Sequence, residues 1–114
     1  MTESTLSPLM EILVNTDNNI TGDESLTQTV EGFVNDAVEH FQDHITRVEV
    51  HLNDVNSKKG GATDKRCMME ARVKAHPPVA VTHEAESLMF AMDGAAEKLR
   101  AALDTLLGRL HRHP

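Results

Sequence analysis

Apolar and polar residues alternate with a period of two in residues 47–53 and 66–74, and this pattern predicts β-strands. Residues 9–15, LMEILVN, mix apolar residues with one Glu and have no helical period, so a short first strand is expected there with Met10, Ile12 and Val14 on one face. Residues 78–82, PVAVT, form a fourth and shorter strand candidate that begins at a pair of prolines. The loop between the second and third strands contains Gly60-Gly61, so these two strands are expected to form a hairpin with a long tip.

Apolar residues at helical spacing predict two amphipathic helices. The first is expected at about residues 26–43, after a capping box of Ser25 and Gln28. The second is expected to begin after Thr82 as N-cap and to run for roughly 27 residues, with Glu84 and Glu86 in its first turn, where the helix dipole favours acids. Its apolar stripe consists of Leu88, Met92, Ala95, Ala96, Leu99, Ala102, Leu103, Leu106 and Leu110.

Gly94 lies inside this second helix, where glycine costs roughly 1 kcal/mol relative to alanine. We therefore expect the helix to approach the sheet or the first helix closely at this position.

The element order β-α-β-β-β-α predicts an α+β fold. The first helix would be a right-handed crossover between two parallel strands, and the remaining strands would follow antiparallel in a four-stranded mixed sheet. Both helices have one apolar stripe, so both are expected to cover the same face of the sheet. The other face would display Arg47, Glu49, His51, Arg66, Glu70, Arg72 and Lys74. We expect one domain over residues 1–114, with flexible tails at 1–8 and 112–114.

Charge is unevenly distributed along the chain, whose net charge is -7. Residues 1–46 contain nine acidic residues and no Lys or Arg, whereas all 11 Lys and Arg residues fall within 47–112. An anionic partner would therefore be met by the second part of the chain. The excess of basic residues there is only two, which an ordinary solvated surface also carries.

Composition excludes several classes of function. With three Phe and no Trp or Tyr, the chain lacks the aromatic platform on which RNA-recognition sheets stack bases. The single cysteine, Cys67, excludes an internal disulfide and is expected to be buried and inert. No segment has the pattern of a membrane span or a signal peptide, which favours a cytoplasmic protein. No phosphate loop, nucleophile elbow or paired-carboxylate constellation points to an enzyme or a cofactor.

Two motifs leave alternatives open. His40 and His44 have the i, i+4 spacing of a metal pair, but no third ligand is evident, and a favourable interaction with the helix dipole explains them as well. Gly60-Gly61 is flanked by lysines but lacks the strand-loop-helix context of a phosphate loop. It can be a basic hairpin tip that reaches nucleic-acid phosphates, or surface without function.

Four segments in a fixed order resemble the ribosome hibernation-promoting factor and ribosome-associated inhibitor family, also labelled sigma-54 modulation proteins. They are ITRVEVHLNDVN, KRCMMEARV, PVAVTHEA and AMDGAAEKL, and the resemblance runs from about Met10 to Arg109. The most specific stretch is matched by Ala91, Met92, Asp93, Gly94, Glu97, Lys98 and Leu99.

The resemblance implies a non-enzymatic factor that binds the intersubunit side of the small ribosomal subunit. Members occupy the channel used by mRNA and tRNA in the decoding region and keep idle ribosomes inactive under stress. Recognition would be through rRNA shape and phosphates. Long members add a C-terminal domain that pairs ribosomes into dimers, and because this sequence ends at Pro114 we expect it to resemble the short form.

Lys98 is the best-supported rRNA contact because it lies in the matching motif. Charge and position predict further contacts on the hairpin and the last helix, which are Lys65, Arg66, Arg72, Lys74, Arg100, Arg109 and Arg112.

Two features of the sequence depart from the family pattern: the first helix is wholly acidic, and Met89 replaces an aromatic residue. The acidic helix motivates an alternative hypothesis, a protein-interaction module with the same fold that has lost its affinity for rRNA.

Overall fold

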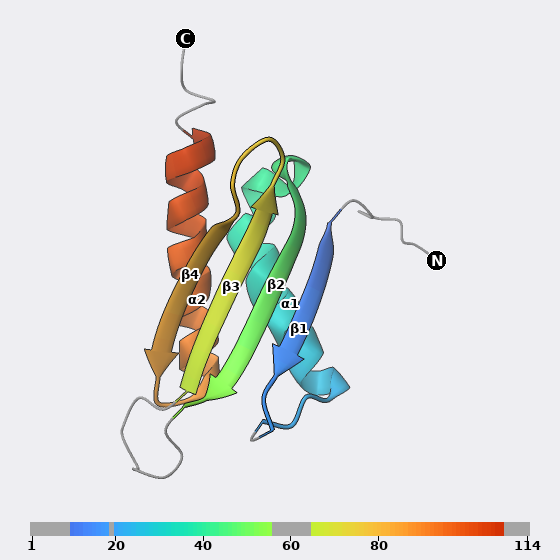
Figure 1. Cartoon of the computed structure of the whole chain (residues 1–114), viewed down its shortest axis with the longest axis vertical. Coiled ribbons are helices and arrows are strands. Elements are labelled where there is room, and N and C mark those ends of the chain that lie inside the picture. Colours follow the sequence, from blue (N-terminus) through green and yellow to red (C-terminus); the bar gives the residue numbers. More distant parts are fainter. Residues whose placement is uncertain (1–9, 19, 56–64, 109–114) are drawn as a thin grey trace.

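The computed structural model describes residues 10–18, 20–55 and 65–108 (Figure 1). In chain order the elements are β1 (Glu11–Thr16), α1 (Glu24–Val38), the 3-10 helix η2 (Glu39–His44), β2 (Ile45–Asp54), β3 (Lys65–Val73), β4 (Val79–Ala85), α2 (Leu88–Leu103) and the π-helical turn η3 (Asp104–Gly108). The predicted Gly60-Gly61 tip and both predicted tails lie outside the described residues.

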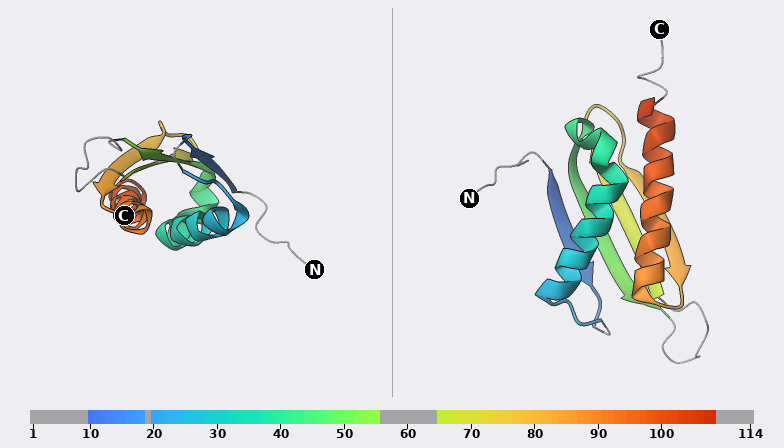
Figure 2. Two further views of the ribbon diagram at one scale, coloured as in Figure 1. Left: turned by 90° about the horizontal axis from the view of Figure 1, so that it is seen from below. Right: turned by 180° about the vertical axis from the view of Figure 1, so that it is seen from behind.

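The four strands form one mixed sheet in the order β1-β2-β3-β4. β1 and β2 are parallel and are joined through α1, while β3 is antiparallel to both of its neighbours. Both helices lie side by side on one face of the sheet, and the sheet curves around them (Figure 2). The predicted α+β architecture is therefore confirmed, as is the pairing of the second and third strands.

The core lies between the helices and the sheet. Val48, Val50 and Leu52 of β2 are completely buried, as are Leu99 and Leu103 of α2. Burial alternates along the central strands, as the period of two predicts, and leaves one polar face of the sheet open.

Cys67 is fully buried in this core, as predicted. Burial raises the pKa of its thiol to about 12, since a thiolate is poorly solvated among apolar side chains. The thiol is therefore protonated at neutral pH, where a thiolate nucleophile would be needed for reactivity.

The predicted start and end of the first helix were wrong by a few residues. Asp23, in extended conformation, is the N-cap, and its Oδ1 accepts a hydrogen bond from the Leu26 backbone N–H at 2.9 Å. Ser25 instead lies in the first turn, where its carbonyl accepts the Thr29 hydroxyl. The α-helix ends at Val38 and tightens into η2, after which the chain enters β2.

The predicted start of the second helix was also wrong. Thr82 and Glu84 belong to β4, which continues because β3 offers partners down to Lys65, opposite Ala85. The N-cap is Ser87, whose Oγ accepts the Phe90 backbone N–H at 3.1 Å, so Glu84 and Glu86 precede the helix. Of the predicted stripe, Leu110 lies outside the described residues. None of the described helices is long and apolar enough to span a membrane.

Candidate nucleic-acid interface

Polar side chains on the open face of the sheet form cross-strand rows. Between β2 and β3, Arg47 lies opposite Arg72, Glu49 opposite Glu70, His51 opposite Met68 and Asn53 opposite Arg66. The predicted solvent-facing set is thus correct for the strand residues, and Lys74 follows β3 as an exposed turn residue. Acidic residues are interleaved with the arginines, so the face is not uniformly basic.

Arg47 is held between two carboxylates. Its Nη1 donates to Glu49 Oε2 at 2.9 Å, and its Nε lies 3.7 Å from Glu11 Oε1 on the neighbouring strand. The hydrogen bond from Arg47 lowers the pKa of the Glu49 carboxyl below its usual value, partly opposed by burial and aided by His51 and Arg72. Much of the Arg47 charge is therefore matched within the sheet.

Lys65 and Arg66 lie at the end of the sheet where β2 stops. Arg66 Nε donates to Glu84 Oε2 at 3.1 Å, and Lys65 Nζ is 3.8 Å from Asp54 Oδ2. Arg66 also borders an open hollow of about 400 Å³ whose lining residues are His51, Asn53, Arg66, Met68, Thr82 and Glu84. Met68 is the one apolar residue of this lining, so the lining residues are mostly polar. Both predicted cations at this end already have a carboxylate partner.

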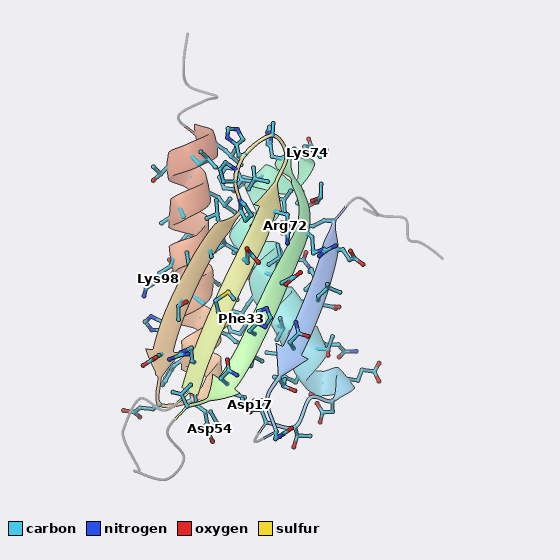
Figure 3. The ribbon with its side chains drawn as sticks, viewed as in Figure 1. Asp17, Phe33, Asp54, Arg72, Lys74 and Lys98 are labelled. Carbon is cyan, nitrogen blue, oxygen red and sulfur yellow. The ribbon has the colours of Figure 1, made fainter. Side chains whose placement is uncertain are left out.

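Arg72 and Lys74 lie at the opposite end of the sheet, beside the turn that leads to β4 (Figure 3). Both side chains are exposed, and neither forms an ion pair with a described residue. The Lys74 backbone N–H donates to the His44 carbonyl at 2.8 Å, and Ala75 follows in a left-handed conformation with φ 65°. Lys74 lies in this turn and Arg72 near the end of β3 just before it, where its charge also acts on Glu49 without a close ion pair. Two exposed cations at one end of the sheet are suited to contact phosphates.

Lys98 and Arg100 point to different parts of the α2 surface. Lys98 lies beside the edge strand β4 (Figure 3), and its Nζ donates to the Thr82 carbonyl at 2.8 Å. Arg100 Nη2 lies 2.6 Å from Glu97 Oε1 and borders a cleft against α1. The described cations of the predicted site are therefore spread over both ends of the sheet, the β4 edge and the helical face. Arg109 and Arg112 lie outside the described residues.

His40 and His44 lie on η2 rather than on α1. The His40 ring packs edge-on against Phe41, with centroids 6.4 Å apart and an interplanar angle of 84°. Among the described residues, no three or more His, Cys, Asp or Glu side chains are grouped so that they could hold a metal ion.

Comparison with known sequences decides the family. The sequence profile described as Sigma 54 modulation protein / S30EA ribosomal protein matches residues 15–111. The chain belongs to this family. The ribosome hibernation family inferred from the four motifs is thus confirmed. No protein with a curated function is detectably similar to the chain in sequence.

Two solved structures share the fold of this sigma-54 modulation protein. The N-terminal domain of Protein Y from Thermus thermophilus superposes with a TM-score of 0.69 at 19% identity, covering 84% of this chain and 98% of that domain. A ribosomal subunit interface protein from Coxiella burnetii gives a TM-score of 0.70 at 13% identity, covering 86% and 98% of the two chains. At these identities the likeness establishes the fold alone.

Proposed function

We propose that the protein binds the small ribosomal subunit in the channel used by mRNA and tRNA and keeps idle ribosomes from translating. The observation that carries this proposal is the family match over residues 15–111. Further support comes from the fold shared with a ribosomal subunit interface protein. The proposed role needs binding and steric exclusion only, and it assigns no catalytic residue.

Within the predicted contact set, Arg72 and Lys74 are the primary phosphate contacts. Both are exposed and form no close ion pair with a described residue, although the charge of Arg72 acts on Glu49 at longer range. Arg66 and Arg100 must exchange a carboxylate for a phosphate, which reduces the net gain. Lys98 donates to the Thr82 backbone carbonyl, which attaches α2 to β4. Because a carbonyl does not neutralise the ammonium group, Lys98 also adds positive charge at the β4 edge.

Sedimentation with purified small subunits tests the proposal. The wild-type protein should comigrate at low salt and be released progressively as salt rises, because phosphate contacts release counterions. A double variant, Arg72→Gln with Lys74→Gln, should comigrate at least about threefold less at an intermediate salt concentration.

A matched control separates local contacts from overall charge. Gln28→Glu with Asn35→Asp makes the same change in net charge at exposed positions of α1. This variant should bind nearly as well as the wild type. A wild-type protein that stays at the top of the gradient even at low salt would refute the proposal.

The second candidate is a protein-interaction module that has lost its affinity for rRNA. The observation in its favour is that α1 and η2 carry five acidic residues and no Lys or Arg. Capture of partners from ribosome-depleted lysate by a protein that fails to sediment with small subunits would favour it. Recovery of ribosomal components alone would contradict it.

A further inference from the structure

A cleft runs between α1 and α2 on the helical side of the molecule, away from the open face of the sheet. It has a volume of about 130 Å³, and its lining residues are Phe33, Asp36, Ala37, Asp93, Ala96, Glu97 and Arg100. Figure 2 shows the two helices side by side on this face, and Figure 3 labels Phe33. Ala37 and Ala96 are buried and small, so together with the half-buried ring of Phe33 they make an apolar floor.

A second hollow of about 330 Å³ lies beside this cleft. Glu97 and Arg100 border both, and the second is completed by His40, Phe41, Ala101 and Asp104. Phe41 is half-buried, like Phe33. Each of the two neighbouring hollows, together called the groove from here on, is thus lined by one half-buried phenylalanine.

The rim of this groove is acidic. Asp36, Asp93 and Asp104 are exposed carboxylates, and Asp36 and Asp93 make no hydrogen bond or ion pair with a described residue. Arg100, the single Lys or Arg in the lining, is already bound to Glu97. α1 and η2 contain no Lys or Arg that could compensate the acidic rim, and their other acidic residues are Glu24, Glu31, Glu39 and Asp43. RNA phosphates are repelled by such a rim, whereas lysine and arginine side chains are attracted.

We propose that the groove between α1 and α2 docks a basic, amphipathic segment of another protein. An apolar side chain of that segment lies against Phe33 and Ala96, and its Lys or Arg side chains reach Asp36 and Asp93. A helix that carries apolar residues at every third or fourth position would fit this arrangement. This proposal does not rest on rRNA binding, for which Arg72 and Lys74 at the end of the sheet are the proposed primary contacts. Of the described residues in the predicted rRNA contact set, Arg100 alone also lines the groove.

Fluorescence anisotropy with two labelled peptides tests the proposal. The probe is a helical peptide of about 12 residues with Lys and Arg around leucines at i, i+4 spacing, and its counterpart has each leucine replaced by serine. At about 0.15 M salt the leucine peptide should bind at least about tenfold more tightly than the serine peptide. Equal affinities, or no binding of either peptide, would overturn the proposal.

Charge-matched variants locate the site. Asp36→Asn with Asp93→Asn should weaken binding of the leucine peptide by about tenfold or more. The control, Glu70→Gln with Glu86→Gln, removes the same charge away from the groove and should change affinity less than about twofold. If both double variants weaken binding of the leucine peptide equally, the peptide is attracted by the overall charge of the protein, and the proposed site is overturned. All four substitutions preserve side-chain shape at positions outside the core, and circular dichroism checks that each variant is folded.

Discussion

The imidazole of His83 on β4 lies directly against Gly94 on α2. A Cβ added at Gly94 would overlap the His83 ring at Cδ2, Nε2 and Cγ. The expected close approach is therefore to the sheet, and it explains a glycine in the middle of a helix. Four residues later, Lys98 reaches back to the neighbouring strand residue, Thr82. The most specific family motif thus serves first to seat α2 on the edge of the sheet.

Gly94→Ala should destabilise the protein, although alanine is the better helix former. The new methyl group displaces His83, and overpacking of this kind costs about 1–3 kcal/mol in the free energy of unfolding. Gly32→Ala in α1 is the control, since a Cβ there meets nothing within 4 Å. It should stabilise the protein by about 0.5–1 kcal/mol. Urea denaturation of both variants measures the two effects, and two changes of the same sign would contradict the packing account.

A double-mutant cycle identifies the partner. In a His83→Ala background, Gly94→Ala should lose most of its cost, because the ring that it displaces is gone. If Gly94→Ala lowers the free energy of unfolding equally in the wild-type and His83→Ala backgrounds, the added methyl group collides with a residue other than His83.

Lys98→Met should lower the free energy of unfolding by about 0.5–1.5 kcal/mol, the range for a single hydrogen bond. The substitution keeps the aliphatic stem but leaves the Thr82 carbonyl of the edge strand without its ammonium donor. Lys74→Met, at an exposed turn position, serves as a comparison and should leave stability nearly unchanged. Equal stabilities of the wild type and Lys98→Met would mean that the hydrogen bond contributes nothing.

Glu84→Gln tests whether Arg66 contacts rRNA. Loss of the carboxylate releases the Arg66 guanidinium from its 3.1 Å ion pair, so binding to small subunits should tighten by about two- to fivefold at fixed salt. Glu86→Gln removes the same charge two residues away without releasing Arg66. If both variants gain the same affinity in a filter-binding assay, Arg66 is not a contact.

The ion pair between Arg47 and Glu49 predicts a pH dependence. The folded-state pKa of Glu49 is lowered from 4.5, so its stabilising contribution is complete above that value and is lost as pH falls through the folded pKa. Arg47→Gln should therefore cost more stability at about pH 6 than at about pH 3. In a Glu49→Gln background the cost should vary much less with pH. A cost that is the same at both pH values in the wild-type background would mean that Glu49 is not the coupled group.

The fold could be predicted because apolar residues recur with the period of a strand or of a helix in its elements. Val48, Val50 and Leu52 alternate over β2 without interruption, and the stripe of α2 continues from Leu88 to Leu103. The predicted helix starts were wrong because more than one residue could form each N-cap. Asp23 and Ser25 both suit a helix start, and Thr82 and Ser87 do so equally, so tertiary pairing decided between them. His83 and Ala85 continue the alternation of Val79 and Val81, a signal that would have extended the fourth strand.

The candidate site could be predicted only as a list of cations. Charge and order in the sequence could not indicate that Glu84 pairs with Arg66, whereas the i, i+3 spacing of Glu97 and Arg100 on a predicted helix could have indicated their pairing. The first pairing depends on the register of β3 and β4, which places Arg66 opposite Glu84. The left-handed Ala75, which shapes the turn after Lys74, has no glycine or asparagine to mark it in the sequence.

Competition on purified small subunits tests the central claim most directly. Subunits carrying labelled mRNA and initiator tRNA are titrated with the protein, and retention of both labels is followed on filters. The account predicts that the protein displaces both labels in parallel with its own binding, and that Arg72→Gln with Lys74→Gln shifts the displacement curve to higher protein concentration. Simultaneous retention of mRNA, tRNA and a full complement of bound protein would contradict it.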